Sequence, residues 1–423
     1  MKNGHILTAI DIGTTKICVI ISQINDDEKI EIKGIGTSPA KGMSKGVVIN
    51  IAEASRSIGL ALKEAEEMAK MRAKNIYIGI AGDHIKSENE TGKTNIDPNK
   101  SGKKKVTQAH IEDIFTDVRK SVSKRQVEQN REIIHIVPQS YTLDNLTGIE
   151  SPLDMAGFVL EAFVHVVQAD KSAIQNMKKC LDNCGHSRIN SIFLEPIASS
   201  KSVLNEVELD LGAIIIDIGG GTTDIAIFYK KSIQFSAVIP IGGTQITSDI
   251  SIGLRVSPEN ADEYKITYGN AMLSQVVENN EFEIEEVNGI ANRKCNSKFI
   301  SKIIESRMRE IMTRASHLLN QIGNLDRFRA GITLTGGSSL LKNCDKLSQE
   351  IFKLPTKIGY PQLNNLVGTT DRLKNPIYST VVGILYQAFA ELKEQNRKKD
   401  DFSNMNLLIK WWKSFKAFLK DFL

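Results

Sequence analysis

The sequence predicts an α/β protein built from two related lobes, with an inserted α+β subdomain and a C-terminal amphipathic helix. The main observation is a repeated phrase, Asp-Ile-Gly followed closely by Thr-Thr, at residues 11–15 and again at 217–223. Apolar runs flank both copies, which is the pattern of a strand, a tight turn and a second strand. The second observation is the tail, residues 405–423, whose apolar and basic positions separate with a helical period. Two equivalent hairpins in one chain indicate two related halves.

The composition is that of a globular protein and argues against several classes. Five cysteines without zinc spacing or a disulfide framework favour a reducing compartment, and the seven histidines do not cluster. The first strand is reached by Ile6, which leaves no room for a signal peptide, and no apolar run has the length of a membrane span. Residues 393–423 hold a net charge of +4, so the rest of the chain is neutral and a nucleic-acid-binding body is not expected.

The first part of the chain alternates strands with a helix, as an α/β lobe does. The expected elements are strands at about 6–12, 17–24 and 30–36, a helix near 51–70 and a strand at 75–82.

Residues 84–166 are expected to form a separate α+β piece. A polar stretch from about 87 to 105 ends in a triple lysine and is interpreted as a mobile loop, whose lysines are solvated or, less favoured, form a binding patch. A helix after Thr107 and strands at 133–143 and 157–166 complete this piece.

The α/β order then returns around the second hairpin. The expected elements are helices at 171–184 and 197–206, a strand at 188–194, a helical region at 244–278, a polar irregular stretch at 279–297, an amphipathic helix at 298–322, a strand at 332–334 and an apolar helix at 377–392.

The expected domains are a first lobe at 1–83 completed by 167–196 and 370–392, the insert at 84–166, a second-lobe core at 197–242 completed by 323–369, an outer subdomain of the second lobe at 243–322, a charged linker at 393–404 and the tail helix at 405–423.

Each repeated turn has the chemistry of a phosphate-binding loop. Glycines let the backbone approach an anion, and threonine hydroxyls add hydrogen-bond donors without charge. The spacing of a Walker loop is absent. Asp11 and Asp217 end their strands and would repel a triphosphate unless a hydrated Mg²⁺ lay between them. A plain hairpin explains one copy equally well, whereas two copies predict one nucleotide site gripped from both sides.

Three further segments fit such a site. Glu195 stands at a strand end where the halves meet and is a candidate to orient a water, although a carboxylate at a helix start explains it as readily. Gly336 and Gly337 follow a strand and permit close approach of a base or a phosphate. Gly242 and Gly243 repeat that arrangement before another helix.

In their order along the chain, these segments resemble the actin, sugar-kinase and heat-shock-chaperone ATPase superfamily. The matching segments are Asp11–Lys16, Phe193–Ser200, Asp217–Asp224, Leu334–Ser339 and Ser379–Ala388. The resemblance implies ATP and Mg²⁺ as cofactors, with Asp11 and Asp217 ordering the waters of Mg²⁺ and Glu195 orienting a water. It implies phosphate contacts for Gly13, Thr14, Thr15, Lys16, Gly219, Gly220, Gly221 and Thr222. It implies further nucleotide contacts for Gly242, Gly243, Gly336, Gly337 and Ser338, and for Glu263 and Lys265, which resemble the helix motif A-E-x-x-K of the superfamily.

The tail has the features of a helix that lies in the plane of a membrane. One face is aromatic and aliphatic and the other is rich in lysine, and both tryptophans of the protein lie here. The alternative is a helix docked on the protein's own core or on a partner. A single tail is expected to anchor reversibly, and several tails on one polymer far more firmly. The residues expected to contact lipid are Leu408, Trp411, Trp412, Phe415, Phe418, Leu419 and Phe422.

Over nearly its full length, the chain resembles the bacterial cell division family FtsA, through segments such as IIHIVPQSY, FLEPIASS and IDIGGGTTDIAIF. The resemblance implies a protein at the division site, on the cytoplasmic face of the cell membrane. It implies self-association into filaments, binding of the C-terminal peptide of FtsZ, recruitment of later division proteins through the insert, and at most slow ATP hydrolysis. Arg307 is implied as the carboxylate partner of the peptide, with an ordinary surface arginine as an equal alternative. Residues 279–297 follow no family pattern.

Two other readings compete with this one. A related pilus-assembly adaptor shares the extra subdomain but is not expected to carry such a tail. A superfamily enzyme such as a sugar kinase needs a general-base carboxylate facing a sugar pocket, and no segment suggests one.

Overall fold

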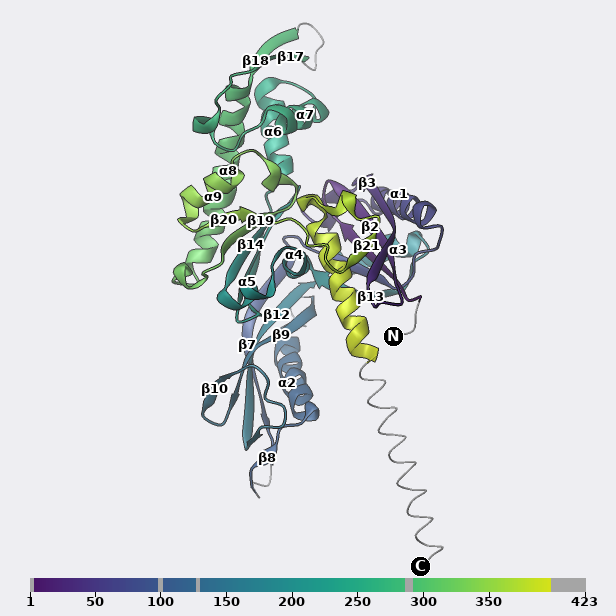
Figure 1. The fold of residues 1–423 in the computed structure, drawn as a ribbon, viewed down its shortest axis with the longest axis vertical. Helices are drawn as coiled ribbons and strands as arrows, with labels where there is room; N and C mark the ends of the chain where they lie inside the picture. The colour runs from purple at the N-terminus through teal and green to yellow at the C-terminus, as the bar shows by residue number, and fades with distance from the viewer. Residues whose placement is uncertain (1–3, 98–101, 127–129, 286–291, 397–423) are drawn as a thin grey trace, which may run out of the picture.

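Two lobes stand side by side, and a smaller subdomain extends beneath them (Figure 1). The computed structural model describes residues 4–97, 102–126, 130–285 and 292–396. The tail at 405–423, with all of its expected lipid contacts, lies outside the described residues. No helix in the described part of the chain is long and apolar enough to cross a membrane.

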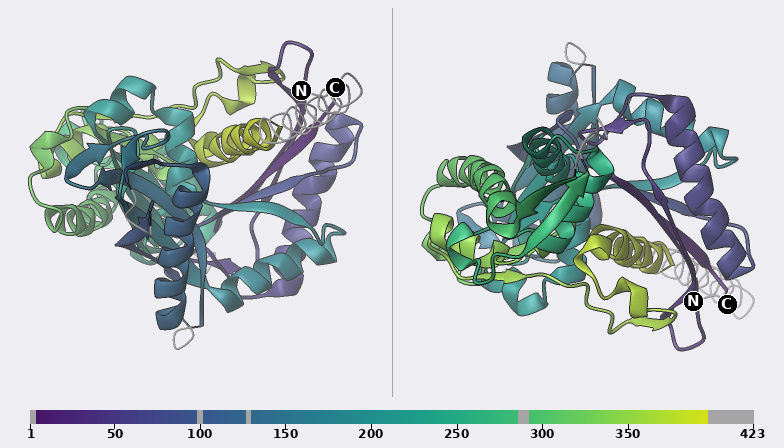
Figure 2. Two further views of the ribbon diagram at one scale, coloured as in Figure 1. Left: turned by 90° about the horizontal axis from the view of Figure 1, so that it is seen from below. Right: turned by 90° about the horizontal axis from the view of Figure 1, so that it is seen from above.

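The first lobe is a six-stranded sheet covered on both faces. Its strand order is β13-β6-β1-β2-β3-β21. One core layer packs α1 (Ile51–Ala69) and α3 (Lys171–Asn183) on the sheet, and the opposite layer packs a helix at residues 379–396. Figure 2 shows this last helix, in yellow, against the purple strands on the side away from α1. The strands are β1 (Ile6–Ile12), β2 (Lys16–Ile24), β3 (Ile30–Pro39), β6 (Ile76–Ile80), β13 (Ile189–Leu194) and β21 (Leu366–Gly368).

The second lobe repeats this plan with five strands in the order β16-β15-β14-β19-β20. In both lobes a hairpin leads, and its first strand also pairs in parallel with a later strand: β1 with β6, and β14 with β19. The strands are β14 (Ala213–Ile218), β15 (Thr223–Tyr229), β16 (Ser232–Ile239), β19 (Gly331–Thr335) and β20 (Thr356–Ile358).

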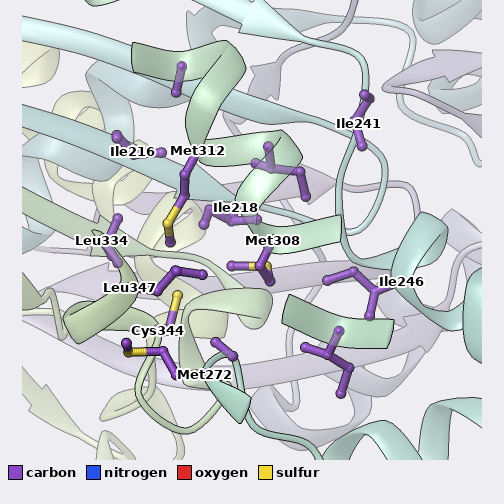
Figure 3. Close-up of a cluster of buried hydrophobic side chains, with 14 of the residues drawn as sticks. Ile216, Ile218, Ile241, Ile246, Met272, Met308, Met312, Leu334, Cys344 and Leu347 are labelled. Carbon is purple, nitrogen blue, oxygen red and sulfur yellow. The ribbon is translucent and has the colours of Figure 1, made fainter. Parts of the chain in front are cut away.

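The core of the second lobe lies between this sheet and three helices, α6 (Gly243–Leu254), α8 (Ser297–Asn320) and α9 (Cys344–Phe352). Met308 and Met312 of α8 belong to one buried cluster with Ile216 and Ile218 of β14 (Figure 3). This cluster includes the strand that carries Asp217, so the packing fixes the position of the second repeated turn.

The polar stretch at 279–297, expected to be irregular, instead forms a hairpin of β17 (Glu281–Glu285) and β18 (Asn292–Asn296). The Phe282 ring stacks on Tyr268 of α7 (Pro258–Tyr268) with centroids 3.8 Å apart. The prediction was wrong because it overlooked the alternation of Glu with Phe282 and Ile284 in β17, a short run that stands among polar residues.

The inserted subdomain is a four-stranded sheet, β10-β9-β12-β7, packed on α2 (Gln108–Gln126). The prediction of a loop at about 87–105 was wrong for its first half, which belongs to the strand β7 (Ile85–Asn95). This strand pairs with β12 along its whole length. In its second half, Lys104 pairs with Asp97 at 3.0 Å, which favours a structural role over a binding patch. The remaining strands are β8 (Lys104–Lys105), β9 (Arg131–Leu143), β10 (Leu146–Ile149), β11 (Ala156–Gly157) and β12 (Val159–Asp170).

Two helices cross where the lobes meet. They are α4 (Glu195–Val203) and the helix at 379–396, and a side-chain carbon at Gly383 would lie 1.8 Å from the carbonyl oxygen of Ala198. The expected helix at 197–206 is in fact two helices, because α4 ends at Val203 and Asn205 caps α5 (Glu206–Leu211). The expected linker at 393–404 begins too early, since its first four residues continue the helix to 396.

Candidate functional site

A cavity of about 430 Å³ lies between the lobes, and both repeated turns line it. Two of the residues expected at a nucleotide site do not line it. Gly242 lies behind the second turn, where a side-chain carbon would be 2.7 Å from the carbonyl oxygens of Gly219 and Gly220. Glu263 does not reach the cavity, whereas the neighbouring residue Asp262 lines it. The expected residues that do line the cavity are Asp11, Gly13, Thr14, Thr15, Lys16, Glu195, Asp217, Gly219, Gly220, Gly221, Thr222, Gly243, Lys265, Gly336, Gly337 and Ser338.

The two turns have the same internal geometry. The Gly13 N–H donates to the Lys16 carbonyl at 3.1 Å, and the Gly219 N–H donates to the Thr222 carbonyl at 3.0 Å. Among the described residues, the N–H groups at the tips of both turns have no hydrogen-bond partner. Successive unpaired N–H groups in a tight turn form a concave site for an anion.

The turns touch each other across the cavity, glycine against threonine. A side-chain carbon at Gly220 would lie 2.4 Å from Thr15 Cγ2, and one at Gly221 would lie 2.4 Å from Thr14 Oγ1. Both distances are far below van der Waals contact, so only glycine permits this approach.

The third loop is held against the second turn. Gly336 has a φ of 82°, and a side-chain carbon there would lie 2.3 Å from Asp217 Oδ1. Ser338 Oγ donates to the Gly219 carbonyl at 3.2 Å, and the Gly243 N–H donates to the same oxygen at 2.9 Å. These bonds occupy carbonyl groups of the second turn and leave the N–H groups at its tip facing the cavity.

Four carboxylates surround the cavity: Asp11, Asp217 and Asp224 are buried, and Glu195 is partly buried. Burial raises the pKa of Asp11 to about 6, and Lys16 opposes that shift. Burial and the nearby Asp217 raise the pKa of Asp224 to about 8. Burial also raises the pKa of Glu195 and of Asp217. So much negative charge in a buried place requires protons or a cation for compensation.

The carboxylates fit a cation that is held through water. In the described part of the chain, no group of three or more His, Cys, Asp or Glu side chains has the arrangement that binds a metal ion directly. Asp224 Oδ1 is buried without a hydrogen-bond partner, while Oδ2 accepts from Thr222 at 2.8 Å. Oxygen ligands and retained waters are what Mg²⁺ prefers, so these side chains suit a hydrated Mg²⁺.

The orientation of Asp217 is set by the two crossing helices. Ser199 of α4 donates to Asp217 Oδ2 at 2.6 Å, and Thr380 donates to the same oxygen at 3.3 Å. These bonds favour the charged form and partly offset the effect of burial on the Asp217 pKa. The site is therefore tied to the contact between the lobes.

Lys16 lines the cavity and is bound to the segment that precedes the helix at 379–396. Its Nζ donates to the Ile377 carbonyl at 2.7 Å and lies 4.2 Å from the centre of the Tyr378 ring. Lys265, at the far end of the cavity, pairs with Asp262 and donates to Thr247 Oγ1 at 2.8 Å.

Two residues that line the cavity but were not predicted as site residues, Asp224 and Asp262, could have been found from the sequence. Asp224 directly follows the second copy of the repeated phrase and pairs across the strands with Asp217. Asp262, rather than Glu263, occupies the acidic position when the spacing A-E-x-x-K is counted from Ala261. Thr380 and the apolar lining of Ile266, Leu340, Leu341 and Ile377 carry no local signal.

Arg307 lies on α8, away from the cavity, and is already paired. Its Nε and Nη2 donate to the two oxygens of Asp249 at 2.7 and 2.9 Å, and Glu310 accepts a third bond. Any carboxylate of a partner must therefore compete with Asp249.

The fold and the cavity define an actin-like two-lobed ATPase fold with an inserted subdomain. A chain of the PilM-PilN type IV pilus biogenesis complex aligns with a TM-score of 0.63 at 14% identity, covering 90% of this chain and 98% of that one. MreB 5 of Spiroplasma citri, bound to AMPPNP, aligns with a TM-score of 0.55 at 16% identity, covering 94% and 99%. The expected fold class is confirmed.

The sequence matches two family profiles, "Cell division protein FtsA" at residues 214–383 and "SHS2 domain inserted in FTSA" at 82–168. Cell division protein FtsA of Pseudomonas aeruginosa is 38% identical over 91% of this chain and 89% of the relative. The protein of the same description from Escherichia coli K12 is 31% identical over 90% of each chain. The chain therefore belongs to the FtsA family of cell division proteins, as its motifs predicted.

The raised carboxyl pKa values predict that the ligand-free protein loses stability as the pH rises. Unfolded carboxylates release their protons near their ordinary value of 3.8, whereas folded Asp11 and Asp224 hold theirs to about 6 and about 8. The folded state therefore binds more protons across this window, and its stability falls as the pH passes through the folded pKa values. The melting temperature should decrease from pH 6 to pH 8.

Asp224→Asn removes one of the titrating groups, so the decrease between pH 6 and pH 8 should become smaller. Replacing the exposed Asp326 by Asn is the matched control and should leave the pH dependence unchanged. If the melting temperature of Asp224→Asn falls as steeply between pH 6 and pH 8 as that of wild type, Asp224 is not one of the groups that titrate in this range.

Proposed function

We propose that this protein is an ATP-dependent adaptor that polymerises on the inner face of the cytoplasmic membrane and ties the FtsZ ring to it at the division site. The observation that carries the proposal is the pair of glycine turns, which present unpaired N–H groups to one cavity above buried carboxylates. Such turns suit the phosphates of a nucleotide, and the carboxylates suit its Mg²⁺. The AMPPNP carried by the MreB 5 structure of the same fold supports this choice of ligand.

ATP acts in this proposal mainly as a ligand that holds the lobes together. The N–H groups of both turns bind phosphate oxygens, and Mg²⁺ supplies the positive charge that the carboxylates need. Glu195, the first residue of α4, orients a water when hydrolysis occurs. A ligand that contacts both lobes favours the closed arrangement and the contacts of a filament.

Gly220→Ala should weaken ATP binding about 5- to 150-fold, because overpacking a close contact costs about 1–3 kcal/mol. The added carbon would lie 2.4 Å from Thr15 Cγ2 and would push the two turns apart. Isothermal titration with Mg-ATP measures the change.

The matched control is Gly59→Ala in α1, where the added carbon meets only Cys184 Sγ at 3.7 Å. Gly59→Ala should bind ATP as wild type does. Unchanged affinity in Gly220→Ala would remove the two-sided grip from the proposal.

The tail provides the membrane anchor in this proposal. The helix at 379–396 ends near the end of the first-lobe sheet at which the strands β3 and β13 begin. Lys393 pairs there with Glu28 at 3.4 Å, and Glu391 accepts from Ser191 at 2.7 Å. We infer that this end of the first lobe faces the membrane. Lysines of the tail then meet anionic lipid, and the aromatic face enters the interface.

Replacing both Trp411 and Trp412 by Glu should release the protein from anionic vesicles. The change removes two aromatic side chains from the interface and adds two charges that anionic lipid repels, so binding should fall at least about tenfold. Co-sedimentation with vesicles measures the bound fraction. Replacing both residues by Phe keeps the apolar face and should preserve binding; persistent binding of the Glu variant would exclude the tail as the anchor.

The outer part of the second lobe is proposed to receive the C-terminal peptide of FtsZ, and the insert to recruit later division proteins. Arg307 is the proposed carboxylate partner, released from Asp249 when the peptide binds. The two variants therefore have opposite expected effects. Arg307→Ala should weaken peptide binding about tenfold, the range of a charge-assisted hydrogen bond. Asp249→Ala removes the competitor and should strengthen it.

Fluorescence anisotropy with a labelled FtsZ C-terminal peptide measures both effects. Arg314→Ala is the control, because Arg314 lies on the same helix and pairs only with Glu310 among the described residues. If Arg307→Ala and Asp249→Ala both leave binding unchanged, the peptide does not use this guanidinium.

A further inference from the structure

The inserted subdomain is attached to both lobes. It leaves and re-enters the first lobe through β7 and β12, and Arg131 clamps these two connections. The Arg131 side chain is buried, donates to the His84 carbonyl at 3.1 Å and pairs with Asp170 at 3.1 Å. The insert is therefore fixed to the lobe from which it arises.

Its second attachment is to β16, the edge strand of the second-lobe sheet. We call this contact the seam: Ser87, Asn89, Gln139 and His165 of the insert against residues 232–236. Gln139 Nε2 donates to the Ile233 carbonyl at 2.7 Å, and Ser87 Oγ donates to the Ser236 carbonyl at 2.6 Å. Side chains of the insert thus satisfy carbonyl groups that an edge strand would otherwise expose.

His165 lies at the centre of the seam. Its Nδ1 is 2.7 Å from Asn89 Oδ1, and its Nε2 is 2.9 Å from Ser236 Oγ. Because Asn89 Oδ1 is an acceptor, Nδ1 carries the hydrogen and the Ser236 hydroxyl donates to Nε2. Ser232 Oγ adds a bond to the Pro138 carbonyl at 2.6 Å. The seam is polar and specific, which fixes where the two parts meet.

The second repeated turn adjoins the far end of β16, where Thr223 pairs with Ile239, and it is also bound to the residues that follow this strand. Thr223 Oγ1 donates to the Ile241 carbonyl at 2.8 Å, and the Thr244 N–H donates to the Gly220 carbonyl at 2.8 Å. Gly220 in turn contacts Thr15 of the first lobe. A shift of this turn is therefore passed directly to the strand that bears the seam.

The seam is made of side chains rather than of a shared ladder. The insert and the second lobe form separate sheets in the described part of the chain, so no backbone hydrogen bonds of a common sheet hold β16 to the insert. The insert cannot follow both lobes when they rotate relative to each other, because Arg131 holds it on the first lobe. Lobe rotation must strain or re-form the seam.

We propose that the insert senses the nucleotide state of the cavity through this seam, so that its surface differs between the nucleotide-bound and nucleotide-free protein. This inference rests on the proposed nucleotide binding and adds the route by which it reaches the insert. The seam is formed in a structure whose two turns are in contact, so a nucleotide that holds the turns together stabilises the seam.

Hydrogen exchange of the full-length protein with and without Mg-ATP tests this inference. Exchange in wild type should slow several-fold both in the cavity turns and in the insert peptides at 85–95 and 131–143. In Gln139→Ala the cavity turns should still slow, while the insert peptides should not. Ser87→Ala is a second variant that removes a single hydroxyl and should show the same loss of transmission.

Gln168→Ala is the matched control, since Gln168 is a buried amide that donates to Glu88 within the insert and, among the described residues, makes no side-chain hydrogen bond to β16. In Gln168→Ala, Mg-ATP should slow hydrogen exchange of the insert peptides as it does in wild type. Thermal unfolding shows whether each variant is folded. If the wild-type protein binds the nucleotide but hydrogen exchange in its insert does not slow, the inference is overturned while the proposed function stands. The same holds if exchange in the insert slows as in wild type in both Gln139→Ala and Ser87→Ala. Absence of Mg-ATP binding overturns the proposed function and the inference together.

Discussion

Buried negative charge between the two lobes is the constraint on which the rest of the structure depends. Asp11, Asp217 and Asp224 lie at adjoining strand ends, and each is at least nine-tenths buried. Lys16, the cation that opposes this charge most directly, is turned toward the Ile377 carbonyl. The lobes can approach in this way only if protons or a cation compensate the charge. Binding of a metal nucleotide and closure of the lobes are, on this account, the same event.

The same place organises the contact between the lobes. Ser199 and Thr380 orient Asp217 from the two crossing helices, which themselves pack through Gly383. Asp217 also excludes any side chain at Gly336. A change in the charge of this cluster therefore acts on the two crossing helices and on the third loop and, in the proposed route through β16, on the insert. This arrangement suits the proposed ligand-controlled adaptor, because the charged groups lie where the two lobes meet.

The hairpins could be predicted because a repeated phrase between apolar runs determines local geometry. That both turns serve one site was predicted from the repetition itself and supported by the family resemblance, but no local pattern predicts the contact of Thr15 with Gly220. The strand β7 was missed because its sequence after Ile85 carries no apolar alternation, whereas β17 alternates Glu with Phe282 and Ile284 over a run short enough to be overlooked. Glu263 was preferred to Asp262 by residue identity, where the spacing was the better guide. The seam joins segments about 70 to 150 residues apart and leaves no trace in the sequence.

Titration of the full-length protein with ATP, in the presence of Mg²⁺ and then with the divalent cation removed by EDTA, tests the central claim most directly. If buried carboxylates face the phosphates, affinity should fall by orders of magnitude without Mg²⁺, because the triphosphate would then enter a site with uncompensated negative charge. Equal affinity in EDTA would contradict the account, since it would show that the phosphates bind away from Asp11, Asp217 and Asp224.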